Sequence, residues 1–155
     1  MGYWLIHVPK TGGTSLRISG IPGEHKIGFR IGFQNILLVR NPIDRTLSHF
    51  KESLDFQDLR FKDWFTSDFW DFQTKYLMKY LGCDSFESVK QFILDKEIIA
   101  IPIDKLTERM KSLGFDISHV NKARREYNPT EEEINLIRTH SGKDFNLYNF
   151  VVSLK

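Results

Sequence analysis

The sequence predicts an α/β fold in which a central, mainly parallel β-sheet is flanked by helices in three layers. Short, continuously apolar segments at 3–8, 35–39 and 97–102 have the composition of strands that are buried on both faces. Segments with helical spacing of apolar residues lie between them, and alternating strands and helices form layered parallel sheets. The chain has 155 residues, which is enough for one compact domain over 1–155.

The first strand opens the chain. Tyr3–Val8 is aromatic and β-branched and stops at Pro9, which is typical of a buried strand, and we expect His7 inside it to be a satisfied core histidine. A glycine-rich loop follows, and a short helix is predicted over 14–19. The stretch 20–33 is rich in glycine and proline, which predicts turns around one short strand.

The second strand leads into a clearly marked helix. Residues 35–39 are apolar, and Asn41 after them is a favoured N-cap residue. Pro42 fits the first helical position, and Asp44 lies in the positive first turn. We therefore predict a helix that continues to about Leu54.

The following segment is expected to be helical, although residues 57–65 are ambiguous. Four aromatic residues share one helical face: Phe69, Phe72, Tyr76 and Tyr80. Three apolar residues share a face of the next helix: Phe86, Val89 and Ile93. Asp84 and Glu87 offer a variant capping box before it.

The last part of the chain also alternates between a strand and helices. Three helices are predicted after the strand at 97–102, over 106–113, 130–140 and 144–152. Thr130 and Glu133 form a capping box that opens the second of them.

The composition argues against several functional classes. A formal net charge of +2 is too small to indicate a nucleic-acid partner. Cys83 is the one cysteine, so neither an internal disulfide nor a thiolate zinc cluster can form, which suits a reducing compartment. The N-terminus lacks the features of a signal peptide, and no stretch approaches the length of a membrane span. We expect a soluble, cytoplasmic protein.

The stretch HVPKTGGTSL (7–16) places a lysine and two glycines between a strand and a helix. Glycines let the backbone approach a ligand closely, and N–H groups that converge at such a turn bind anions. Lys10 adds a full positive charge. The other donors are the backbone and hydroxyl groups of five residues: Thr11, Gly12, Gly13, Thr14 and Ser15. An ordinary strand–helix turn is the alternative interpretation.

This loop differs from the Walker A phosphate loop. In that motif the lysine follows the glycines, whereas Lys10 precedes them. A kinase of that class also needs a magnesium-binding acid at a strand end. Here Arg40 follows the second strand, and Asp104 follows the third only after a proline. A kinase-like nucleotide-binding enzyme is therefore the less favoured alternative.

A second cationic motif, VRNPIDRTLSHF (39–50), follows the second strand. Arg40 stands at the carboxyl end of a strand, where open α/β sheets bind ligands. Ser48 follows in the next helix, where its spacing places it on the same helical face as Asp44 and Arg45. A guanidinium fork and a hydroxyl suit a second phosphate group. Anion sites at the ends of two strands predict a ligand with phosphates at two positions.

Together, PKTGGTS (9–15) and VRNPIDRTLSHF resemble the 5′-phosphosulfate loop and the 3′-phosphate motif of sulfotransferases, most closely the carbohydrate-type and bacterial enzymes. The second motif has the form V-R-[DN]-P-x-x-R-x-x-S-x-[FY] in that family. Later segments that also resemble the family are DFQTKYL (71–77), IAIPIDKLTERMKSLG (99–114), and NPTEEEINLIRTHSGKDFNLYNFV (128–151) with its D-x-x-L-Y pattern.

The resemblance implies a P-loop-like form of the three-layer fold. It also implies 3′-phosphoadenosine 5′-phosphosulfate (PAPS) as the donor and no metal. The sulfuryl group would pass to an acceptor hydroxyl or amine, and adenosine 3′,5′-bisphosphate (PAP) would be released. Lys10 would stabilise the charge that develops on the leaving phosphate. The loop 11–15 would hold the 5′-phosphosulfate, and Arg40 and Ser48 would hold the 3′-phosphate.

The resemblance further implies a general base between the two motifs. GEHKIGF offers Glu24 and His25. Members of the family often have a histidine before the stretch that leads to the second motif, which favours His25, and the ordinary pKa of histidine near neutrality suits a general base. A later loop of the family lies against the donor, which points to Lys122 and Arg124 here. A non-catalytic remnant that binds an anionic nucleotide or a protein partner is an open alternative. The acceptor can be a carbohydrate, a small alcohol, a lipid or a protein tyrosine.

Overall fold

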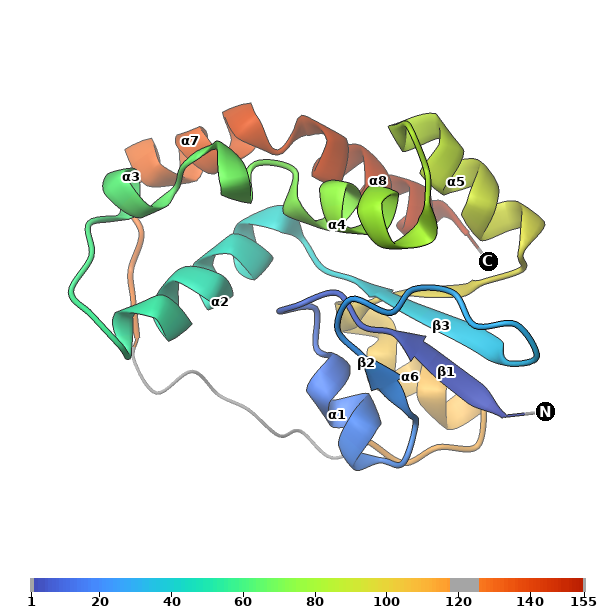
Figure 1. The fold of residues 1–155 in the computed structure, drawn as a ribbon. Helices are drawn as coiled ribbons and strands as arrows, with labels where there is room; N and C mark the ends of the chain where they lie inside the picture. The colour runs from blue at the N-terminus through green and yellow to red at the C-terminus, as the bar shows by residue number, and fades with distance from the viewer. Residues whose placement is uncertain (1, 118–125, 155) are drawn as a thin grey trace.

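The computed structural model describes residues 2–117 and 126–154, which are arranged around one four-stranded sheet (Figure 1). The strands are β1 (Tyr3–Ile6), β2 (Gly23–Glu24), β3 (Gln34–Val39) and β4 (Ile99–Pro102). Their order is β2-β1-β3-β4, and each neighbouring pair is parallel. The predicted α/β class and parallel sheet are therefore confirmed.

Helices connect the strands and continue after the last one. They are α1 (Gly13–Ile18), α2 (Pro42–Leu54), α3 (Phe61–Trp64), α4 (Phe72–Leu81), α5 (Phe86–Asp95), α6 (Leu106–Ser112), α7 (Glu131–His140) and α8 (Gly142–Ser153), with short 3₁₀ helices η1 (Ser67–Phe69) and η2 (Ile103–Lys105). None of the helices in the described part of the chain is long and apolar enough to cross a membrane.

Alternate residues of each strand face opposite layers of helices. On one face, Trp4, Ile6 and Leu37 pack against residues of α4, α5 and α8. On the other face, Leu5 and Ile36 pack against residues of α1 and α6. Figure 1 shows α4, α5 and α8 above the sheet and α1 and α6 below it. Both faces of the strands are buried, which explains why their sequences are continuously apolar.

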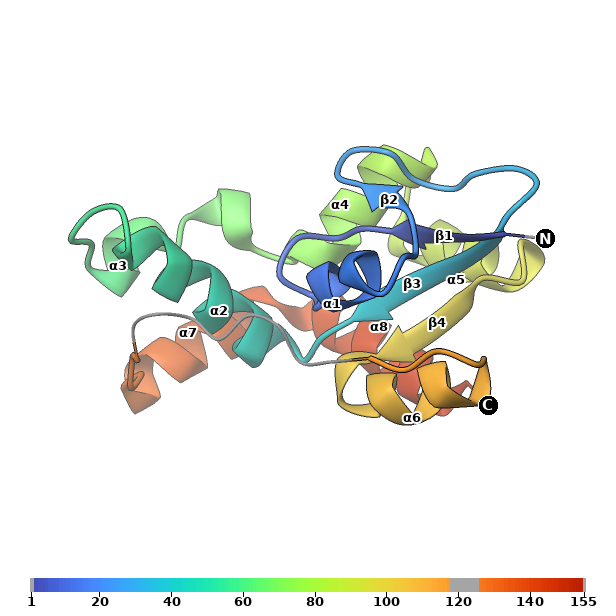
Figure 2. The ribbon, with the colours of Figure 1, turned by 90° about the horizontal axis from the view of Figure 1, so that it is seen from below.

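A helical extension lies beyond the carboxyl ends of the strands (Figure 2). Helix α2 leaves the sheet there and packs against α3 and α7. The buried residues at this contact form what we call the aromatic cluster: Leu47, Phe50, Phe61, Trp64, Phe65 and Ile137. The extension thus has an apolar core of its own beside the two cores of the sheet.

Helix caps explain most of the element boundaries. The Asn41 side chain accepts a hydrogen bond from the Ile43 N–H at 2.9 Å, so the predicted N-cap of α2 is confirmed. The capping box of Thr130 and Glu133 is present at the start of α7. The cap of α5, however, is not the predicted Asp84. Ser85 takes this position because its hydroxyl accepts from the Ser88 N–H at 3.1 Å.

The aromatic face predicted from Phe69 to Tyr80 is interrupted. Phe69 belongs to η1, whereas α4 begins only at Phe72. Asp71, between the two, has a φ of 47°, and this left-handed conformation breaks a continuous helix. Residues 57–65, which were ambiguous, contain the single turn of α3.

Candidate functional site

The segments singled out from the sequence meet at the carboxyl edge of the sheet. Because all four strands are parallel, the loop after β1, His25 after β2, Arg40 after β3 and Asp104 after β4 leave the sheet at one edge. Ligands of open α/β sheets bind at this edge.

The glycine loop is a tight turn in which both glycines are needed for packing. Gly12 has a φ of 95°, and a Cβ atom there would lie 2.5 Å from Cδ1 of Ile103. A Cβ atom on Gly13 would lie 2.4 Å from the ring of His7. The Thr11 hydroxyl is buried and donates to the Val8 carbonyl at 2.7 Å, so it stabilises the turn. These three residues therefore have a structural reason for being in the loop, whatever the loop binds.

Lys10 and Thr14 are more accessible than the buried Thr11 and Gly13. Lys10 has a φ of 64°, a left-handed conformation that a residue with a side chain rarely adopts and that is enriched at functional sites. Thr14 is exposed in the first turn of α1. Ser15 follows in the same helix, but its side chain is outside the described structure. The predicted donor contacts Lys122 and Arg124 lie outside the described residues altogether.

The second motif holds the first through two arginines. Arg40 Nη1 donates to the Lys10 carbonyl at 3.4 Å, and Arg45 Nε donates to the Pro9 carbonyl at 3.1 Å. Burial lowers the pKa of Arg40, with Asp44 acting in the opposite direction. Two successive carbonyls of the loop are thus held by the two arginines of VRNPIDR, which lie far from them in the sequence.

Two of the later segments support Arg40 from behind. The Gln73 side chain pairs with both backbone groups of Arg40, accepting from its N–H at 3.0 Å and donating to its carbonyl at 2.8 Å. The buried carboxylate of Asp144 accepts from the Gln73 N–H at 3.1 Å and from the Thr74 N–H at 2.8 Å. Asp71 in turn accepts from the Asp144 N–H at 3.0 Å. The DFQT and D-x-x-L-Y segments are therefore joined in one hydrogen-bonded network at the site.

Ser48 lies on α2, half-buried, one helical turn before Glu52. The carboxylate of Glu52 forms an ion pair with the Lys10 ammonium. The face of α2 that carries Ser48 therefore lies toward the loop. Sequence reasoning missed Glu52, although its spacing of four residues from Ser48 could have suggested it.

His25 lies beside the loop and against a second histidine. The His25 and His7 rings are 4.0 Å apart between centroids. Partial burial and the charge of Arg17 lower the pKa of His25, so the imidazole is neutral at pH 7 and able to take a proton. Burial, followed by His25 and Arg17, lowers the pKa of His7 to about 4. His7 is buried as predicted, but its Nδ1 has no hydrogen-bond partner among the described residues, so the expectation of a satisfied histidine is wrong.

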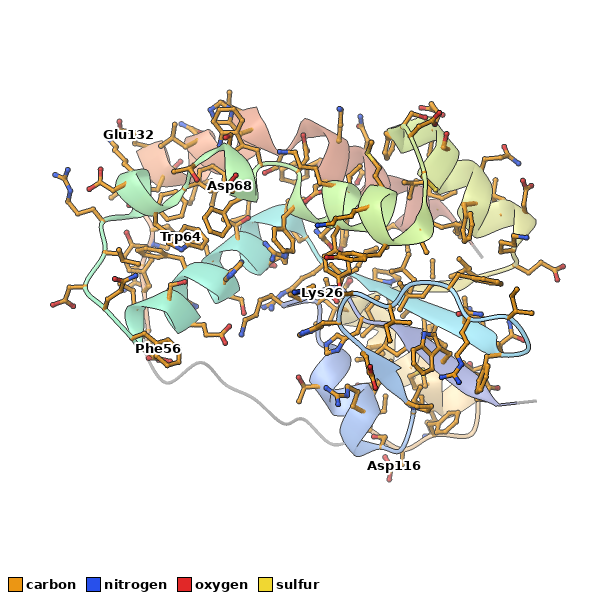
Figure 3. The ribbon with its side chains drawn as sticks, viewed as in Figure 1. Lys26, Phe56, Trp64, Asp68, Asp116 and Glu132 are labelled. Carbon is orange, nitrogen blue, oxygen red and sulfur yellow. The ribbon has the colours of Figure 1, made fainter. Side chains whose placement is uncertain are left out.

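The loop that carries His25 is tied to α4. The N–H of Lys26, which has a φ of 66°, donates to the Tyr76 hydroxyl at 2.6 Å. Figure 3 shows Lys26 between the sheet and α4, near the middle of the molecule. This contact fixes the backbone next to His25.

Two features near the end of β4 do not join this group. Tyr148 donates to the Asp104 carboxylate at 3.2 Å, so the acid considered for magnesium is paired with a tyrosine. A cavity of about 590 Å³ runs along β4 between α5 and α8, and it contains Asp104 but neither Lys10 nor Arg40. Among the described residues, no three histidine, cysteine or acidic side chains gather as metal ligands.

Comparison with known proteins assigns no family, since no family model, curated protein or solved structure matches this chain. The function is therefore inferred from the residues of the site.

Proposed function

We propose that this chain is a small PAPS-dependent sulfotransferase with a P-loop-like donor site. The observation that supports this most directly is the contact between Arg40 Nη1 and the Lys10 carbonyl, 3.4 Å apart, because it joins the two predicted phosphate motifs at one sheet edge. PAPS carries phosphate groups at both its 5′ and 3′ positions, and a single-phosphate ligand would need only one motif.

In this proposal the cationic groups bind the donor and stabilise its leaving group. The loop 11–15 holds the 5′-phosphosulfate, chiefly through its backbone, since the Thr11 hydroxyl is used internally. Arg40 and Ser48 hold the 3′-phosphate. Lys10 lies at the bond that breaks and stabilises the negative charge that appears on the 5′-phosphate oxygen.

His25 completes the reaction as general base. The acceptor hydroxyl gives its proton to the imidazole while its oxygen attacks the sulfur of the donor. The bond between sulfur and the bridging phosphate oxygen breaks, the sulfuryl group stays on the acceptor, and PAP leaves. The neutral imidazole favoured at His25 is the form that this step requires.

Calorimetric titration with PAP and with adenosine 5′-monophosphate tests the donor. We expect PAP to bind more tightly by about 10- to 100-fold, the effect of charged hydrogen bonds to the 3′-phosphate. Arg40→Ala should abolish most of this preference. Arg60→Ala is the matched control, because Arg60 is exposed and pairs with Asp63 in the helical extension. Equal affinity for the two nucleotides in the unchanged protein would contradict the proposal.

The acceptor is tested by incubation with labelled PAPS and a panel of a carbohydrate, a small alcohol, a lipid and a tyrosine peptide. Transfer to any of them supports an enzyme. PAP binding without transfer to any acceptor would favour the non-catalytic alternative. Magnesium-dependent hydrolysis of ATP would favour the kinase-like one.

A further inference from the structure

Arg45 is a buried cation whose contacts do not account for its charge. Its side chain is 1% exposed. Nε donates to the Pro9 carbonyl at 3.1 Å, Nη2 donates to Nδ1 of His49 at 3.1 Å, and Cζ lies 3.7 Å from the ring centre of Phe72. The two acceptors are a carbonyl and a neutral imidazole. A neutral donor would satisfy either of them.

The acid that acts on this charge is Asp144, but it does so at a distance and not through an ion pair. Within residues 2–117 and 126–154, neither Arg45 nor Arg40 forms an ion pair with an acid. Asp144 acts on Arg45 through space, but its oxygens accept hydrogen bonds from Gln73 and Thr74. In the same part of the chain, Arg45 Nη1 is buried without a hydrogen-bond partner.

A buried cation without an ion-pair partner destabilises a folded protein, often by several kcal/mol. Burial, together with the nearby charge of Arg40, lowers the pKa of Arg45 to about 10, which still leaves the guanidinium charged at pH 7. The fold therefore accepts an unfavourable positive charge directly behind the loop. An anion bound at Lys10 and Arg40 would compensate it.

We propose that Arg45 is the positioning residue of the anion site. It holds the loop through the Pro9 carbonyl, and its buried positive charge next to the loop is balanced by a bound phosphate group. The identity of the anion as PAP rests on the proposed function. The role of Arg45 itself concerns any phosphate compound at this loop, and inorganic pyrophosphate is a suitable probe.

The test compares three substitutions in the full chain. Arg45→Met keeps length and apolar contact with Phe72 but loses the charge, Arg45→Gln keeps a donor without the charge, and Arg45→Lys keeps the charge without the fork. Binding of pyrophosphate and PAP is measured by calorimetry, and unfolding of the unliganded proteins by urea. Arg60→Met is the matched control for loss of one exposed arginine.

We expect both neutral variants to bind pyrophosphate about tenfold or more weakly, the loss typical of a charged interaction. Arg45→Lys should retain most of the affinity. The unliganded neutral variants should be at least as stable as the unchanged protein, because an uncompensated charge is gone. A purely structural clamp would instead lower stability in all three variants.

The proposal is overturned if the neutral variants bind pyrophosphate as the unchanged protein does, or if Arg45→Lys binds as weakly as they do. Failure of both neutral variants to fold would overturn it too, since it requires them to be stable. A third result would separate the two proposals. If pyrophosphate binding depends on the charge at position 45 but the protein binds PAP no more tightly than adenosine 5′-monophosphate, PAPS is rejected as the donor and the role of Arg45 stands.

Discussion

Helix α2 takes part in two regions that are built from opposite kinds of side chains. On the site, it contributes Arg45 and Ser48, and its arginine has no ion-pair partner among the described residues. In the aromatic cluster, it contributes Leu47 and Phe50, which are buried among apolar rings. Neighbouring residues of α2 therefore belong to different regions, because successive residues of a helix are rotated by about 100° around its axis and lie on different faces.

The difference shows how the fold offsets the unfavourable free energy of placing cations at the site. Collecting cations at the sheet edge opposes folding, whereas burying aromatic surface favours it. The aromatic cluster joins α2 to α3 and α7, so it stabilises the helix that carries the charge of Arg45. Figure 2 shows these three helices beyond the carboxyl ends of the strands. Stability and binding should then respond to substitutions in different regions.

The largest expected effect is that of Phe50→Ala on stability. Phe50 is fully buried, and its ring centroid lies 5.2 Å from the ring centroids of Phe61 and Trp64. Removing it should lower the free energy of unfolding in urea by about 3–5 kcal/mol. Phe56→Ala is the control, because Phe56 follows the same helix but is 84% exposed. Equal losses in both variants would show that the cluster is not a distinct core.

Lys10→Ala should instead lower activity strongly and change stability little. We expect sulfuryl transfer to fall by about 100- to 1000-fold, as when one charge-stabilising donor is removed. Its ion pair with Glu52 is partly exposed and contributes little, so the free energy of unfolding should change by less than about 1 kcal/mol. Lys51→Ala, on the same helix as Glu52, is the control for loss of one lysine. Unchanged turnover would remove Lys10 from catalysis.

A smaller effect should appear when pH is varied. Burial lowers the pKa of His7 and of His49 from 6.5 to about 4, with His25 and Arg45, respectively, as the next cause. Between these pH values the unfolded chain binds more protons, so the free energy of unfolding should rise with pH from about 4 to 6.5. His49→Gln still offers an acceptor to Arg45 but cannot titrate, and it should reduce this dependence to the part that comes from His7. The same slope in that variant would contradict the assignment to His49.

The sequence allowed the strands, most helices and the candidate edge to be predicted, because these depend on local signals. Strand composition marks β1 and β3, and Asn41-Pro42 marks the start of α2. A parallel sheet then brings the ends of the strands together without further information. The predicted ligand roles of Lys10, His25, Arg40 and Ser48 remain predictions.

The rest depended on contacts between distant segments. The packing reason for Gly12 involves Ile103, and the aromatic cluster joins α2 to α7. The ion pair of Lys10, and the lack of a described hydrogen-bond partner for Arg45 Nη1, follow from how α2 packs across the loop. No local pattern specifies such a crossing.

The hydrogen bonds of Asp144 also have a consequence for how the molecule assembles. They connect α8 to the first turn of α4 across 71 residues, and Gln73 passes this connection to Arg40. Bringing the two ends of such a long segment together costs chain entropy, and contacts of this kind slow folding. Even with the sheet already paired, the backbone at Arg40 would lack its final support until α8 docks. A chain interrupted before α8 would therefore keep every residue proposed to bind the donor and still hold one of them poorly.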